Sequence, residues 1–143
     1  MSVVFVTGVT RGIGRKIAEL FIERGHDLYG CARTESSIDG ARKIFACDVR
    51  SLEELKKCPQ YLIDNEGKCD VLINNAGITQ DKTLQKMTLD QWHEVIDTNL
   101  FGVHYSTSAF LPSLLMSDPR LHCEHFISRC STWRVWANKL QCV

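Results

Sequence analysis

Short apolar runs alternate with amphipathic stretches along the first 112 residues. The runs at 2–8, 26–33, 42–49 and 69–77 predict four buried β-strands, because each is short and bounded by polar or turn-forming residues. Between the first two runs, apolar residues recur at helical spacing, and Gly25 follows where a helix C-cap is expected. Strands that alternate with helices imply a parallel sheet covered by helices.

Two further helices begin at capping signals. Ser51 and Glu54 have the spacing of a capping box, and Pro59 is expected to limit or kink the helix that follows. Thr88 and Gln91 form a second box, from which one long helix is predicted to about residue 112.

Composition narrows the class of protein. The 143 residues suffice for one domain, and Lys plus Arg equals Asp plus Glu at 17 each, so nothing indicates a nucleic acid or membrane partner. No apolar run approaches the roughly 20 residues that span a bilayer, and the run at 3–6 lacks the flanks of a signal peptide. The seven cysteines, without a C-x-x-C pair, indicate reduced thiols and a cytoplasmic location.

The segment His122–His125 is open to two interpretations. It holds metal-ligand residue types, but further ligands would have to come from elsewhere in the chain. A plain polar loop is favoured, and no metal site is predicted. A fifth strand is expected at 124–128, and the pattern is lost after Ser128.

A glycine-rich loop, TGVTRGIG, joins the first strand to the first helix. Gly8, Gly12 and Gly14 allow a tight turn and a close approach of the backbone to a pyrophosphate, which the helix N-terminus attracts. The alternative is an ordinary strand–helix turn. A Walker A loop is excluded, because no Gly-Lys-Ser/Thr follows at the required offset.

Four motifs in order, TGVTRGIG, CDV, NNAG and TNLFG, resemble the classical short-chain dehydrogenases/reductases. The likeness covers roughly residues 2–112 and is greatest to the 3-oxoacyl-carrier-protein and acetoacetyl-CoA reductase branch. It implies a Rossmann-type, doubly wound α/β fold with strands 1–5 of the usual seven, in the order 3-2-1-4-5. Family members are usually homotetramers or dimers, and this chain lacks part of that interface.

The resemblance also implies residue roles. Asp48 would bind the adenine amine with Val49 beside the ring, or else serve as a loop or cap residue. Asn99 would organise a water in the proton relay, or else bond backbone within its helix. The remaining cofactor contacts would come from the glycine loop and from the end of the fourth strand. They are Gly8, Val9, Thr10, Arg11, Gly12, Ile13, Gly14, Asn75, Ala76 and Gly77.

The second strand ends in Ala32 and Arg33, where NAD enzymes usually carry an acidic residue. A guanidinium there pairs with the 2′-phosphate of NADP, and Arg11 is a second cation nearby. NADP(H) is therefore the predicted cofactor; the alternative is that both arginines are solvated surface charges.

The acid–base centre of the family, a serine and a Tyr-x-x-x-Lys pair, is not found in residues 1–143. Ser128 falls near the serine position. The residues four positions after Tyr29, Tyr61 and Tyr105 are Arg33, Asn65 and Ala109 respectively.

The tail after Ser128 is expected to be aberrant. Read one base out of frame, codons for WANKLQCV (136–143) permit Gly-Gln-Thr-Asn-Tyr-Ser-Ala-Ser, the kind of sequence that the family carries around its tyrosine. A frame change is the favoured interpretation; a splice variant and a divergent tail remain open. The predicted domains are an NADP-binding unit at 1–128 and the tail at 129–143.

By lineage the predicted function is NADPH-dependent reduction of a 3-oxoacyl thioester or similar ketone, with this chain itself inactive. The alternative is a non-catalytic nucleotide-binding fragment or a non-functional product. A coenzyme-independent interaction protein is a third, disfavoured interpretation, because it requires an incidental glycine loop.

Overall fold

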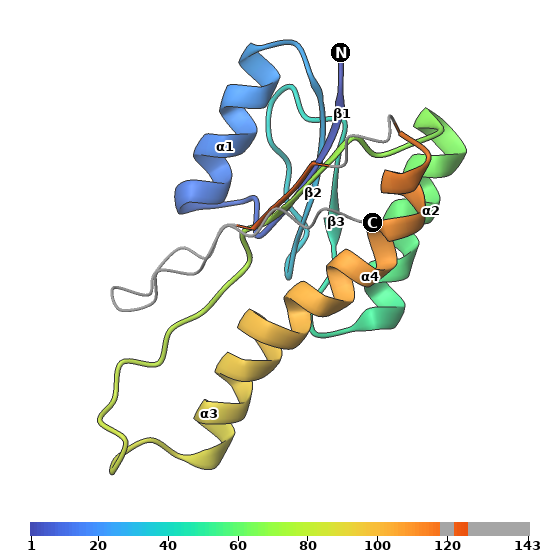
Figure 1. The fold of residues 1–143 in the computed structure, drawn as a ribbon. Coiled ribbons are helices and arrows are strands. Elements are labelled where there is room, and N and C mark those ends of the chain that lie inside the picture. Colours follow the sequence, from blue (N-terminus) through green and yellow to red (C-terminus); the bar gives the residue numbers. More distant parts are fainter. Residues whose placement is uncertain (118–121, 126–143) are drawn as a thin grey trace.

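The computed structural model describes residues 1–117 and 122–125. Strands and helices alternate as the sequence predicts, except that β3 follows β2 with no helix between them (Figure 1). The elements are β1 (Val3–Thr7), α1 (Gly12–Glu23), β2 (Asp27–Ala32), β3 (Lys43–Ala46), α2 (Leu52–Glu66), β4 (Val71–Asn74), α3 (Leu89–Ile96), the π-helical turn η1 (Asp97–Phe101), α4 (Gly102–Leu115) and β5 (His122–His125).

Within the described part of the chain, five parallel strands form one sheet in the order β3-β2-β1-β4-β5. Helix α1 covers one face, and α2 and α4 cover the other (Figure 1). The doubly wound α/β fold and its predicted strand order are thereby confirmed. The N-terminal strand is central, which places the loop that follows it in the middle of the molecule.

The side chains of β1 alternate between two apolar layers. Phe5 packs on Phe110 of α4, with ring centroids 4.4 Å apart, whereas Val4 and Val6 join the layer beneath α1. Burial of one such side chain contributes about 1.5–3 kcal/mol to stability. Because β1 contributes side chains to both layers, both of its faces are covered, and all five of its residues are buried.

Helix α2 runs through Pro59 to Glu66, so the expectation that Pro59 limits this helix is wrong. A proline inside a helix costs about 3 kcal/mol. Leu55 and Leu62, which lie on either side of it, are fully buried in the layer with Phe5, and this packing offsets the cost. The capping box is half formed: the Ser51 side chain accepts from the Glu54 amide, but the Glu54 carboxylate accepts from the amide of Asp48 instead.

The single long helix expected from Thr88 has its complete capping box, but a π-helical turn at Asp97–Phe101 separates α3 from α4. The turn carries Asn99, whose side chain bonds the Ile78 backbone. The spacing of apolar residues, on which the helix prediction rested, contains no information about such a contact and so could not predict the π-helical turn.

Strand β5 begins two residues earlier than expected and pairs with β4, so a polar loop at His122–His125 is wrong. Residues 126–128, the other part of the expected strand, lie outside the described residues, as does the tail at 129–143. Among the described residues no group of three or more His, Cys, Asp or Glu is placed to hold a metal ion. No helix in this part of the chain is long and apolar enough to cross a membrane.

Candidate nucleotide-binding site

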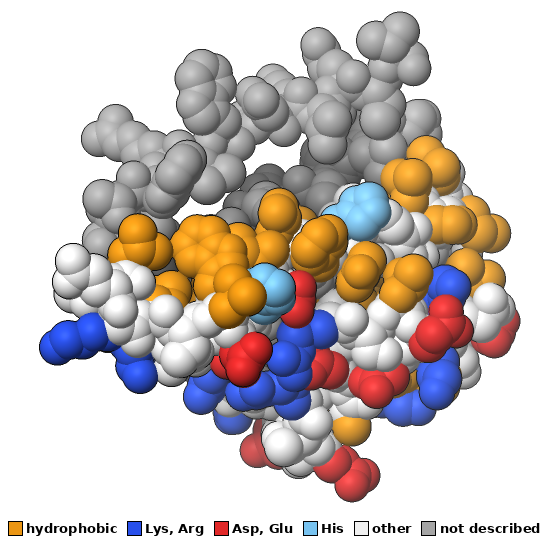
Figure 2. Space-filling view, turned by 90° about the horizontal axis from the view of Figure 1, so that it is seen from below, with side chains coloured by type: hydrophobic (Ala, Val, Ile, Leu, Met, Phe, Trp, Pro, Cys, Tyr) orange, Lys and Arg blue, Asp and Glu red, His pale blue; other side chains and the backbone are white. Residues whose placement is uncertain are grey.

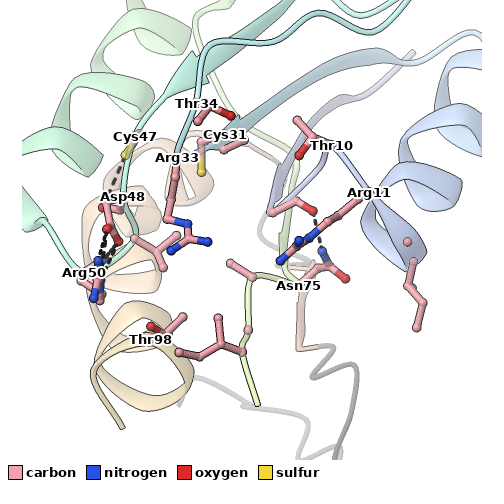
Figure 3. Close-up of a pocket in the computed structure, with 18 of the residues that line it drawn as sticks. Thr10, Arg11, Cys31, Arg33, Thr34, Cys47, Asp48, Arg50, Asn75 and Thr98 are labelled. Atoms are coloured by element: carbon pink, nitrogen blue, oxygen red, sulfur yellow. Dashed lines mark hydrogen bonds and ion pairs between the residues drawn. The ribbon is translucent and has the colours of Figure 1, made fainter. Parts of the chain in front are cut away.

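A cavity of about 840 Å³ opens at the carboxyl ends of β1, β2 and β4 (Figure 3). The chain crosses from one face of the sheet to the other between β1 and β4, so the cavity lies at a topological switch point, where open α/β sheets bind ligands. Its walls are the glycine loop, the segments after β2, β3 and β4, and Thr98 of η1.

The glycine loop needs its glycines for two different reasons. Gly8 and Gly12 have φ of 66° and 56°, in the left-handed region. Gly14 is buried in the first turn of α1, where a Cβ would lie 2.3 Å from Nδ2 of Asn75 and 2.4 Å from the Gly8 carbonyl oxygen. The loop therefore lies directly against the segment that follows β4.

Thr7 holds these two segments together, and sequence reasoning missed it. Its buried hydroxyl accepts from the amides of Asn75 and Ala76, both at 3.0 Å. The Asn75 side chain donates in return to the carbonyls of Thr7 (2.9 Å) and Gly8 (3.0 Å). A threonine directly before the first glycine was the available signal, but the β4 partners are 66–69 residues away in sequence.

We expect Thr7→Val to lower the free energy of unfolding by about 2–4 kcal/mol, because two amides lose their acceptor in a buried site. Thr7→Ser keeps the hydroxyl and is the matched control, with a smaller loss. Urea unfolding followed by circular dichroism measures both. A valine variant as stable as the serine variant would contradict the role given to the hydroxyl.

Arg11 and Arg33 extend into the cavity from opposite sides (Figure 3). Both are exposed, and within the described residues neither guanidinium makes a hydrogen bond or an ion pair, although Arg33 is near enough to Asp48 to help lower the pKa of that carboxylate. Arg50, which also lines the cavity, is in contrast tied to Asp48 and lies 4.0 Å from Glu94. The two unengaged cations are thus available to an anionic ligand.

Asp48 stands at the cavity wall, but its carboxylate is already bonded. The Arg50 side chain donates to it at 2.6–3.1 Å, and the Arg50 amide at 2.9 Å. Hydrogen bonds from Arg50 hold the pKa of Asp48 below its usual value. A carboxylate has about four lone-pair sites, so it retains capacity for a further donor. Val49 is buried beside it and packs on Gly102.

The other predicted residues divide into two groups. Thr10, Ile13, Ala76 and Gly77 line the cavity. Val9 does not: it is fully buried and packs against Gly30 in the layer beneath α1.

Asn99 does not line the cavity either. Its Oδ1 accepts from the Ile78 amide and its Nδ2 donates to the Ile78 carbonyl, both at 2.9 Å. The side-chain amide of Asn99 therefore ties η1 to the segment after β4. Its bonding partner, Ile78, lies outside the helix that carries Asn99. Ser128 lies outside the described residues, so the structure does not place it relative to Asn99.

The chain is similar to known oxidoreductases over most of its length. It is 36% identical over 121 residues to the 3-oxoacyl-acyl-carrier-protein reductase FabG of Vibrio harveyi, covering 80% of this chain and 50% of that protein. The corresponding protein of Chlamydia pneumoniae is 38% identical over 122 residues, covering 78% and 49%. The chain thus spans about half the length of these curated relatives.

A solved structure of another dehydrogenase is also similar to this chain. The ligand-free aldohexose dehydrogenase of Thermoplasma acidophilum superposes with a TM-score of 0.77 at 32% identity, covering 81% of this chain and 45% of that one. The short chain dehydrogenase family matches residues 2–120. The glycine loop, the segment after β4 and the parallel sheet that joins them therefore belong to a member of the short-chain dehydrogenase family, which is a family of oxidoreductases.

Proposed function

We propose that residues 1–128 are the NADP(H)-binding part of a short-chain reductase that acts on a 3-oxoacyl thioester or a similar ketone. One observation carries the proposal: the glycine loop, the end of β4 and two unengaged arginines surround a single cavity. The names of the two curated relatives supply the substrate class, and the geometry of the cavity supports the nucleotide.

The residues present fit a dinucleotide. A Cβ at Gly14 would have no room, whereas Gly12 has nothing within 4 Å of its Cβ position, so the loop is closed toward Asn75 and open at Gly12. Asn75 Oδ1 is a buried acceptor for which the described residues provide no donor, and a sugar hydroxyl or a water can supply one. Gly8, Arg11, Gly12 and Ile13 would hold the pyrophosphate and the adenosine ribose, and Asp48 and Val49 the adenine.

Charge favours the phosphorylated cofactor. Arg33 follows β2 directly, which is where the adenosine ribose lies in nucleotide-binding folds of this kind. The nearest carboxylate that interacts with this guanidinium, Asp48, is ion-paired with Arg50 instead, so a 2′-phosphate can pair with Arg33.

When bound, the nicotinamide would supply the hydride for the reduction of a carbonyl carbon. The chain's own residues would bind and orient: Asn75, Ala76 and Gly77 at the nicotinamide ribose, and Asn99 by fixing η1 against Ile78. Asn99 and Ser128 remain the proposed contributors to the catalytic site, and neither supplies a general acid.

The alternative is a nucleotide-binding fragment without catalysis. The positions of the three tyrosines support this alternative. None of them lines the cavity. Burial and a hydrogen bond to Glu66 raise the pKa of Tyr29, which is the opposite of what a proton-donating phenol requires.

Titration with NADPH tests the binding role. We expect saturable binding that becomes about tenfold weaker in Arg11→Ala, because one charge-assisted contact to phosphate is lost. Arg24→Ala is the matched control, since Arg24 is an exposed arginine at the opposite end of α1 and away from the cavity. Calorimetry measures each affinity. Absence of saturable binding, or equal weakening by both variants, would contradict the proposal.

A further inference from the structure

Three buried thiols that the proposed function does not use meet beside the cavity. Cys31 lies near the end of β2, Cys47 directly follows β3, and Cys58 lies on α2, all in the same apolar layer. Cys31 and Cys47 also line the cavity, on the side that carries Arg33 and Asp48 (Figure 3).

Cys47 is the centre of this thiol cluster. Hydrogen bonding with Cys31 and Cys58 favours a negative charge on its sulfur, as the Lys57 ammonium does more weakly, whereas burial and the neighbouring Asp48 carboxylate oppose it. The Cys47 thiol itself donates to the Asp48 carbonyl at 3.8 Å. The hydrogen bonds with Cys31 and Cys58 lower the pKa of Cys47, whereas the hydrogen bond with Cys47, together with burial, raises the pKa of Cys31 and of Cys58. Cys47 therefore ionises first, and the thiolate is the reactive form of cysteine.

We propose that Cys47 is an oxidation site, at which a peroxide joins Cys47 to Cys31 in a disulfide that weakens nucleotide binding. The effect on binding rests on the proposed function, whereas the disulfide itself does not. Cys31 is assigned as the second thiol because it shares the cavity wall with Cys47, whereas Cys58 does not line the cavity.

The chemistry balances with hydrogen peroxide as the oxidant. The Cys47 thiolate attacks one peroxide oxygen, the O–O bond breaks, and sulfenic acid and hydroxide form. The Cys31 sulfur then attacks the Cys47 sulfur, the S–O bond breaks, and the oxygen leaves as water with the proton of the Cys31 thiol. Peroxide is reduced and the two thiols are oxidised by two electrons. Cys47 is only 3% exposed, so an oxidant must be small enough to reach it from the cavity.

The two cysteines adjoin three parts of the proposed nucleotide site: the glycine loop, Arg33 and Asp48. The Cys31 carbonyl accepts from the amides of Gly8 (2.9 Å) and Val9 (3.3 Å), so it holds the glycine loop. Arg33 follows Cys31 by two residues, and Asp48 follows Cys47 directly.

The disulfide requires movement of these segments. The register pairs Cys31 with Phe45 and Ala32 with Ala46, so Cys47 lies beyond the position opposite Cys31. A disulfide joins Cα atoms about 4.4–6.8 Å apart, so closing this offset displaces the ends of β2 and β3 that carry Arg33 and Asp48.

Peptide mapping of the folded 143-residue chain after peroxide treatment tests the disulfide. Trypsin places Cys31, Cys47 and Cys58 on the separate peptides 25–33, 44–50 and 58–68. We expect peptides 25–33 and 44–50 to be joined with the loss of two hydrogen atoms, and dithiothreitol to separate them. Cys58→Ser should leave this link intact, whereas Cys31→Ser should leave a Cys47 sulfenic acid that dimedone traps. A link from Cys47 to Cys58, or an unmodified Cys47 while other cysteines oxidise, would overturn the assignment.

NADPH titration of the reduced and oxidised chain tests the coupling. We expect binding about tenfold weaker after oxidation, and full recovery with dithiothreitol. If the disulfide, rather than oxidation elsewhere, is responsible, Cys31→Ser should have the same affinity for NADPH before peroxide treatment as after it, once excess peroxide has been removed. Unchanged affinity in a fully linked parent chain would overturn the coupling. If the reduced chain binds no NADPH, the proposed function fails, and the mapping alone decides whether the disulfide exists.

Discussion

Replacing Arg33 by aspartate is expected to reverse the cofactor preference from NADPH to NADH. In the parent chain the guanidinium would pair with the 2′-phosphate, and a charge-assisted bond of this kind contributes about 1.5–3 kcal/mol, or roughly 10–100-fold in affinity. In Arg33→Asp a carboxylate repels that phosphate and accepts from the ribose hydroxyls of NADH. Calorimetric titration of both nucleotides into both chains measures the ratio of affinities.

Arg24→Asp is the control for this substitution, because it makes the same change of charge at an exposed arginine away from the cavity. It should leave the preference unchanged. The position assigned to the 2′-phosphate is wrong if Arg33→Asp and Arg24→Asp shift the ratio equally.

A second large effect concerns turnover: residues 1–143 are expected to oxidise no measurable NADPH in the presence of acetoacetyl-CoA. General acid catalysis supplies about 10²–10⁴ in rate, and poor orientation of the substrate adds to the loss. No tyrosine of this chain has a lysine four residues later. Tyr29 donates to Glu66, and Tyr105 stacks on Phe101. The ring centroid of Tyr61 lies 3.9 Å from the Lys43 ammonium. None of the three tyrosines lines the cavity.

The matched comparison is the same gene continued in the frame that places a tyrosine and a lysine beyond Ser128, which we expect to restore NADPH oxidation. Loss of absorbance at the nicotinamide band measures both chains. Robust reductase activity from the purified 143-residue chain would contradict this prediction, as would a coding sequence whose shifted frame meets an early stop.

A broad apolar surface lies over α3 and α4, as Figure 2 shows from below. Its members are exposed hydrophobic side chains of the two helices and η1. They are Leu89, Trp92, Leu100, Phe101, Leu111, Leu115 and Met116. Exposed apolar area of this extent is typical of a surface that other protein atoms cover. We therefore expect the 143-residue chain to associate in solution, and a sharp monomer peak in size-exclusion chromatography would contradict this expectation.

The glycine loop could be predicted from sequence because it follows from a short-range pattern, whereas the strand order was implied by the resemblance to the short-chain dehydrogenases/reductases. An apolar run before three glycines and an amphipathic helix fixes the β1–α1 turn, and alternation with helices fixes a parallel sheet. The contacts that shape the site are long-range. The Thr7 hydroxyl bonds amides that follow β4, and Asn99 bonds Ile78 across 21 residues, so the bonding partner of neither side chain can be read from the neighbouring sequence.

Competition between interactions explains the remaining differences. Pro59 opposes a helix locally, but burial of Leu55 and Leu62 favours it more strongly. Asp48 lines the cavity, but its pairing with Arg50 two residues later was not foreseen. The strand at His122–His125 contains three polar residues and one cysteine, so its sequence does not indicate the pairing with β4 that the sheet shows.

The most direct test of the nucleotide site is an amide NMR titration of isotope-labelled residues 1–143 with NADPH. The account predicts that the largest shift changes fall on Gly8, Gly12, Asp48 and the segment after Asn75, with little change along β3 and the far end of α1. The shift changes of these residues should all reach saturation with the same apparent affinity. Shift changes that are absent, or that cluster on the α3–α4 surface instead, would contradict the assignment of this cavity as the nucleotide site.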